Sequence, residues 1–231
     1  FLAARATEPP VVPHADRPAG LAVRRPGLLL VATALVMTGV IFGANEVIAV
    51  AYAEEEGAKT FSSIILGAFA LGSTIAGLLF GTRIFRSSMT QRLLLAAAGM
   101  FVLEVPALFV GGLWPLVVVM FIAGSATAPL LITSLSLAQR LVPKALVTEG
   151  MAVAITGILI GISAGSAVAG WAIEAWGAQP EYVVPVVAGA CAFLIIAARY
   201  RYLEGAELAA APEHTPTPAP VPATDPAQTP A

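Results

Sequence analysis

The chain alternates long apolar runs with short polar breaks. Each apolar run has about 20 residues or more, the length that crosses ~30 Å of hydrocarbon as a helix. Strands of a membrane barrel would be about half as long and would alternate apolar with polar residues. The pattern therefore predicts an all-α, polytopic membrane protein with six transmembrane helices, at about residues 28–52, 61–82, 91–112, 115–138, 148–175 and 182–200.

Composition supports a membrane protein. Hydrophobic residues make up 58% of the 231 residues and charged residues 11%, and the mean hydropathy is +0.87. A soluble domain has roughly one-quarter charged residues. The net charge is -2, and the sequence contains no basic patch suited to nucleic acid, so we expect no nucleic-acid partner.

The two ends differ from the apolar middle. Residues 1–27 are rich in Pro and Ala and are predicted to be a cytoplasmic linker. Residues 204–231 carry Pro at short intervals and few large apolar side chains, so we expect a disordered cytoplasmic tail after a transmembrane domain at 28–203. The sequence starts without Met and without a signal-peptide pattern, and we expect it to be part of a longer protein.

Lys and Arg are distributed unequally between the two sides. If the N-terminus lies inside, only Lys59 falls in an outer loop. An excess of Lys and Arg marks the cytoplasmic side, which predicts a multi-pass protein of the cell membrane with both termini in the cytoplasm. The basic residues assigned to the inner side are Arg5, Arg17, Arg24, Arg25, Arg83, Arg86, Arg92, Arg140, Lys144, Arg199 and Arg201.

A short internal repeat links the second and fifth helices. LGSTIAG at residues 71–77 and AGSAVAG at residues 164–170 share GSxxAG at an offset of 93 residues. The same offset carries the third helix onto the sixth. This order predicts two three-helix units of opposite topology, as in transporter halves built from inverted repeats.

Several segments resemble the C-terminal half of a major facilitator superfamily (MFS) transporter. They are the basic Pro-rich leader, the loop GTRIFRSSMTQR after the second helix, and TSLSLAQRLVPKALVTEGMA across the fourth and fifth. The resemblance covers about residues 20–203. In that family a Gly, Asp and Arg motif marks this loop. Gly77, Arg83 and Arg86 match it, whereas Gly81 stands where the Asp is expected.

The resemblance implies a secondary transporter that moves a small molecule by alternating access. It also implies a missing N-terminal six-helix half as partner, and a central cavity lined by the first and fourth helices of each half. Contact with membrane lipid follows from the predicted helices. Proton-coupled efflux is the expected direction and energy source.

Glu46 is the sharpest functional candidate, because it lies inside the first apolar run. A carboxylate facing lipid would cost about 2.5 kcal/mol or more, so Glu46 should face a wet cavity and bind a proton or substrate cation. Alternatively, it is hydrated near the outer interface or bonds a neighbouring helix. Asn45 lies about 100° around the helix, and Thr38 shares the face of Asn45. These two side chains either contact substrate or join this helix to the next.

The fourth helix carries a second polar face. Thr127 and Ser134 are seven residues apart, and Pro129 breaks the backbone ladder between them. The resemblance implies that they form the facing wall of the cavity. The alternative is that both bond their own helix backbone. Glu104, two residues before Pro106, is interpreted as an interhelical bond, because the resemblance implies that the third helix is peripheral.

Glycines and a basic loop are the remaining candidates. Gly72, Gly77, Gly165 and Gly170 are predicted to let helices pack closely, in a contact that either stays fixed or slides during transport. The cytoplasmic loop residues Arg83 and Arg86, together with Arg92, either fix topology and meet anionic lipid or latch onto an acidic helix end.

The sequence offers little for catalysis. His14 and His214 both lie in the polar ends, and neither an HExxH helix nor GxxxxGK[ST] occurs. Cys191 is the single cysteine. We therefore expect neither enzyme activity nor a cofactor or metal site. The transporter hypothesis has one alternative, a self-contained six-helix membrane protein that acts as a homodimer or as a non-transporting scaffold.

Overall fold

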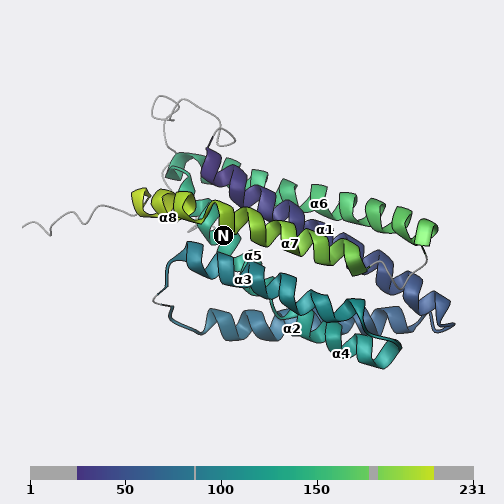
Figure 1. The fold of residues 1–231 in the computed structure, drawn as a ribbon. Helices are drawn as coiled ribbons and strands as arrows, with labels where there is room; N and C mark the ends of the chain where they lie inside the picture. The colour runs from purple at the N-terminus through teal and green to yellow at the C-terminus, as the bar shows by residue number, and fades with distance from the viewer. Residues whose placement is uncertain (1–24, 86, 177–181, 211–231) are drawn as a thin grey trace, which may run out of the picture.

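The computed structural model describes residues 25–85, 87–176 and 182–210, which form a bundle of helices (Figure 1). The predicted all-α membrane fold is confirmed: five helices are long and apolar enough to cross a membrane, or up to six if α7 and α8 form one bent span. The helices are α1 (Pro26–Glu55), α2 (Phe61–Gly81), α3 (Met89–Glu104), η4 (Val105–Leu108), α4 (Leu113–Gly124), α5 (Thr127–Leu141), η5 (Lys144–Leu146), α6 (Val147–Trp176), α7 (Val183–Ala198) and α8 (Tyr200–Ala209).

Prolines account for two differences from the expected spans. The fourth span is interrupted at Ser125, between α4 and α5. Pro129 lies four residues later, and a proline both lacks an N–H and clashes with the carbonyl four residues before it. The third span leaves the α-helical form after Glu104 and continues as the 3₁₀ turn η4, which contains Pro106. Each break therefore lies within one turn of a proline.

The ends of the domain also differ from the expected bounds. α1 begins at Pro26, a position where the missing N–H of proline costs nothing. α8 follows α7 at a bend of 60° and continues to Ala209, so the tail predicted to begin at residue 204 starts too early. The remainder of the predicted linker, residues 1–24, and of the predicted tail, residues 211–231, lie outside the described residues.

α1 is the central helix of the bundle. It packs mainly against α6, α7 and α5. Within its most apolar window 61% of the residues are buried, against 17% for α2 and 22% for α6. α2 and α6 therefore present most of their apolar side chains to the outside of this chain.

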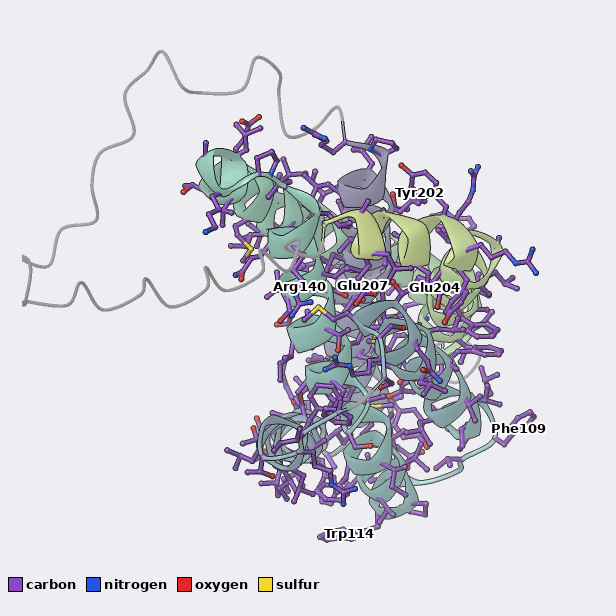
Figure 2. The ribbon with its side chains drawn as sticks, turned by 90° about the vertical axis from the view of Figure 1, so that its left-hand side faces the viewer. Phe109, Trp114, Arg140, Tyr202, Glu204 and Glu207 are labelled. Atoms are coloured by element: carbon purple, nitrogen blue, oxygen red, sulfur yellow. The ribbon has the colours of Figure 1, made fainter. Side chains whose placement is uncertain are left out.

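The end of the bundle that holds the α4 N-terminus is marked by aromatic side chains. Phe109 is 82% exposed and Trp114 is 66% exposed, and both project away from the bundle (Figure 2). Trp114 also packs edge-to-face on Phe61, with ring centroids 5.0 Å apart. Exposed aromatic side chains near helix ends are typical of membrane interfaces.

Two helix pairs approach so closely that glycine is required. At six glycines a Cβ would overlap a backbone carbonyl of the neighbouring helix. Between α1 and α6 the pairs are Gly39 with Ile158, Gly43 with Ile162, Gly161 with Val36 and Gly165 with Val40. Between α2 and α4 they are Gly72 with Phe121 and Gly124 with Phe69. Because small residues let backbones approach, both contacts are the type that joins helices in membranes.

Four of these glycines form the same arrangement in both contacts. Phe69 and Gly72 of α2 correspond to Ile162 and Gly165 of α6 at the offset of 93 residues that the sequence repeat predicts. Their partners on α1 and α4, such as Gly43 and Gly124, are likewise related by a constant offset of 81 residues. The repeat therefore extends from the sequence to the helix–helix contacts.

The other two predicted packing glycines behave differently. A Cβ on Gly77 would lie 3.0 Å from the Cβ of Ala128, which is a tight contact with α5. A Cβ on Gly170 would meet nothing within 4 Å among the described residues. The prediction that Gly170 packs closely against a neighbouring helix is therefore not met among the described residues.

The opposite end of the bundle is tied together by α8. The Glu207 carboxylate accepts hydrogen bonds from the backbone N–H of Met89 at 2.8 Å and of Thr90 at 2.9 Å, and from the Thr90 hydroxyl at 2.8 Å. These are the free N–H groups at the start of α3, where a carboxylate is favoured. α8 is thereby anchored to the bundle.

The contacts of the basic loop before α3 do not distinguish between its two predicted roles. Arg92 donates to the carbonyls of Ser87 at 3.0 Å and Ser88 at 3.4 Å. Arg83 is exposed, and no ion pair within 4 Å involves it in the described part of the chain. Arg86 lies outside the described residues. The two interpretations of this loop, lipid contact and latch, therefore both remain predictions.

The turn between α1 and α2 contains the predicted outer basic residue. Gly57 adopts a φ of 68°, the left-handed region that glycine enters without strain. Lys59 forms an ion pair with Glu54 of α1, and the hydrogen bond and charge of Glu54 raise the pKa of Lys59. Because the pair is exposed to solvent, it contributes little to stability.

Replacing a glycine at a repeated contact should separate two helices. We expect Gly72→Ala and Gly165→Ala each to lower stability by about 1–3 kcal/mol, because the added methyl group overlaps a backbone carbonyl. Thermal unfolding of the purified protein in detergent measures the change. Gly170→Ala is the matched control and should be neutral. Equal stability of all three variants would contradict the close contacts.

Candidate functional site

Glu46 is exposed beside a cavity of about 540 Å³ between α1, α2 and α6. At ~1.5 Å per residue it lies about 8 Å from the middle of α1, within the thickness of the hydrocarbon layer. Glu46 is the single ionisable side chain among the described residues that line this cavity. Glu46 therefore borders open space within this chain, and its predicted role in binding a proton or a cation stays a prediction.

Most of the cavity wall is apolar. Phe42 of α1 and Phe69 of α2 meet edge-to-face, with ring centroids 5.8 Å apart, and Ile158 and Ile162 of α6 also line the cavity. Apolar surroundings have a low dielectric constant, which strengthens any interaction that Glu46 makes with a cation. The cavity therefore has the composition of a site for an organic solute.

Asn45 forms the polar link between α1 and α3. Its side-chain amide Nδ2 donates to Oε1 of Glu104 at 2.6 Å, and the two residues are 2% and 1% exposed. The expectation that Glu104 bonds another helix is confirmed. Asn45 Oδ1 is buried and has no hydrogen-bond partner among the described residues, while Asn45 also contributes to the wall of the Glu46 cavity.

This polar pair lies where two apolar clusters meet. Along α3 and η4, Glu104 lies between Met100 of one buried cluster and Ala107 of the other. In α1, the first cluster extends to Ile41 and the second begins at Ala44, next to Asn45. The hydrogen bond therefore crosses the bundle at the level where its apolar core is divided.

The remaining predicted site residues do not line the cavity. Thr38 is fully buried and donates to the Ala34 carbonyl of its own helix at 2.9 Å. Thr127 and Ser134 are fully buried in α5, and their hydroxyl oxygens lack partners in the described chain. The expectation that Thr127 and Ser134 form the facing wall does not agree with this geometry, because helix α5 turns both hydroxyls into the bundle.

α2 supplies two polar wall residues that the sequence analysis did not select. Ser73 and Thr74 line the same cavity as Glu46, and the Thr74 hydroxyl donates to the Ala70 carbonyl at 2.8 Å. Both follow Gly72 within the repeated GSxxAG segment. Gly72 could have identified these two residues from the sequence. It sets the face of α2 that packs on α4, and this in turn determines which face of α2 is left to line the cavity.

The fold and the cavity define a polytopic membrane protein with a candidate solute site. The family model of the Major Facilitator Superfamily matches residues 27–227. The chain therefore belongs to this superfamily, and its general class is that of a membrane transporter, a class that is generally non-enzymatic. Comparisons with curated proteins and with solved structures give no significant match.

The Asn45–Glu104 bond should contribute measurably to stability. Asn45→Leu removes the donor and leaves a buried carboxyl group unpaired, which should lower stability by about 1–3 kcal/mol. Glu104→Gln keeps an acceptor oxygen and should cost less. Thermal unfolding in detergent compares the variants.

A double variant supplies the control. Asn45→Leu combined with Glu104→Leu leaves neither partner of the bond unpaired. The double variant should therefore be more stable than the sum of the effects of Asn45→Leu alone and Glu104→Leu alone implies. Strictly additive effects would show that the two side chains do not interact in the folded protein.

Proposed function

We propose that the protein transports a small molecule across the membrane by alternating access, with Glu46 as its proton- or cation-binding group. The observation that supports this proposal most directly is the exposed Glu46 carboxylate beside a largely apolar cavity of about 540 Å³. An ionisable residue at membrane depth is expensive unless it serves a wet cavity or a pathway. Membership of the superfamily supports the same function.

The chemistry of the cavity favours a solute with an apolar body. Phe42 and Phe69 offer ring edges and faces, and Glu46 offers a negative charge at one side. When Glu46 is protonated the charge disappears, so a proton and a substrate cation compete for the same group. This competition couples proton entry to substrate release, and it is the basis for proposing proton-driven efflux.

Asn45 is proposed as the polar neighbour of Glu46 in this site. Its Nδ2 is held by Glu104 and its Oδ1 remains unpartnered among the described residues. A bound donor group, or a water molecule that enters the cavity, would satisfy that oxygen. Thr38, Thr127 and Ser134 are left out of the proposed site because they are buried away from it.

The second wall of the cavity is proposed to come from a preceding N-terminal six-helix half. α2 and α6 flank the cavity and are the least buried long helices of this chain, so they are the natural surfaces for such a partner. This arrangement makes the present chain the C-terminal half, placed in the cell membrane with both termini in the cytoplasm. Rocking of the two halves then exposes the cavity to each side in turn.

Glu46→Gln tests the proposal. In vesicles that contain the intact protein, the variant should move fluorescent organic cations at least tenfold more slowly under a pH gradient. Its residual transport should lose most of its pH dependence, because the carboxylate that lines the cavity is gone. Initial rates measured at several pH values provide the data.

Two further variants complete the design. Glu46→Asp keeps the charge and should retain partial transport, whereas Glu174→Gln removes an exposed carboxylate of α6 outside the cavity and should change nothing. Unaltered transport with unaltered pH dependence in Glu46→Gln would remove Glu46 from the mechanism.

A further inference from the structure

A second cleft lies at the end of the bundle that is predicted to face the cytoplasm. It has a volume of about 740 Å³ and is formed by the start of α1, the end of α5 with the following turn, and α8. Figure 2 views the bundle from this end, with Arg140 of α5 and Tyr202 of α8 labelled. Glu46 and its cavity take no part in this cleft.

Three cationic side chains line the cleft. They are Arg25 at the start of α1, Arg140 in the last turn of α5 and Lys144 in the next turn. The described residues that line it include no carboxylate. None of the three cations forms an ion pair within 4 Å inside the described ranges. The cleft therefore has an excess of positive charge with no internal counter-ion.

A carboxylate of α8 interacts with this charge but does not form an ion pair with it. Glu207 of α8 lies close enough to Arg140 to interact with it electrostatically. Both of its oxygens, however, accept hydrogen bonds at the start of α3, from Met89 and Thr90. Arg140 thus keeps its guanidinium donors available for a ligand. A phosphate group suits these donors, since arginine binds its oxygens in a bidentate manner.

An apolar groove adjoins the basic cleft. The groove has a volume of about 280 Å³ and runs along α1, where Leu29, Leu30 and Thr33 line it, and Arg199 and Tyr202 complete its lining. Pro26 and Tyr202 line both spaces, so the groove and the cleft are neighbours. Leu29 is 43% exposed, and it lies about one turn deeper along α1 than Arg25. The groove therefore leads from the basic cleft toward the hydrocarbon layer.

We propose that the cleft and groove together bind one anionic phospholipid. The phosphate group lies among Arg25, Arg140 and Lys144, and one acyl chain lies along Leu29 and Leu30. Basic pockets between helices on the cytoplasmic side are suited to lipid head groups, since that leaflet carries the anionic lipids. Free phosphate shares the chemistry of the head group but has no apolar part that could occupy the adjoining groove. The groove therefore favours the lipid as the occupant.

The proposal is tested by lipid titration of the purified intact protein in neutral detergent, followed by native mass spectrometry. The probes are phosphatidylglycerol, phosphatidylcholine and inorganic phosphate. We expect phosphatidylglycerol to bind with the highest affinity. Arg25→Gln with Lys144→Gln should weaken it roughly 25-fold, because each basic side chain near a phosphate contributes about fivefold.

Two single variants distinguish the parts of the site. Arg201→Gln removes an exposed charge of α8 outside the cleft and should leave the affinity for phosphatidylglycerol unchanged. Leu29→Trp fills the groove and should weaken the binding of phosphatidylglycerol without weakening that of inorganic phosphate.

Three results would overturn the proposal. If phosphatidylcholine binds as tightly as phosphatidylglycerol, binding does not depend on the negative charge of the lipid head group. Inorganic phosphate that displaces phosphatidylglycerol at millimolar concentration, with Leu29→Trp neutral, would indicate a soluble phosphate as the ligand. Equal losses in Arg201→Gln and in the Arg25 and Lys144 variant would indicate diffuse surface charge.

Discussion

The rotational setting of α1 depends on the hydrogen bond between Asn45 and Glu104. Both groups are buried in an apolar interior, where an unpaired carboxyl or amide group costs considerably more than a paired one. Rotating α1 about its axis would break this bond and leave both partners unpaired. Because Glu46 follows Asn45 by about 100°, the orientation that holds Asn45 against α3 also turns Glu46 toward the cavity.

The Asn45–Glu104 hydrogen bond does not determine how closely the other helices approach. Glycine contacts set the distance between α1 and α6 and the distance between α2 and α4. Gly43 and Gly165 allow the backbones of α1 and α6 to touch, and Gly72 and Gly124 do the same for α2 and α4. Van der Waals packing of close backbones, rather than the hydrophobic effect, favours such contacts in lipid. The walls of the Glu46 cavity come from α1, α2 and α6, so three of the four helices in these repeated contacts also define the site.

The two polar regions of this chain share one helix but are far apart. α1 contributes Arg25 to the basic cleft and Glu46 to the cavity, and the 21 positions between them correspond to about 30 Å of helix. This separation exceeds the Debye length of about 8 Å at physiological ionic strength. Charge at one end therefore exerts little direct influence on the other. The proposed lipid anchors the end of α1 without competing for the proposed transport site.

The sequence by itself determined the all-α class, the approximate position of each span, the repeat at an offset of 93 residues and the special position of Glu46. These features follow from local physics, because run length, glycine spacing and the cost of a charge in lipid act along a single helix. The tertiary structure decided which polar residues meet. It paired Asn45 with Glu104 across 59 positions and left Gly170 open. It also buried Thr127 and Ser134, since the face a helix shows to the cavity depends on its neighbours and not on its own period.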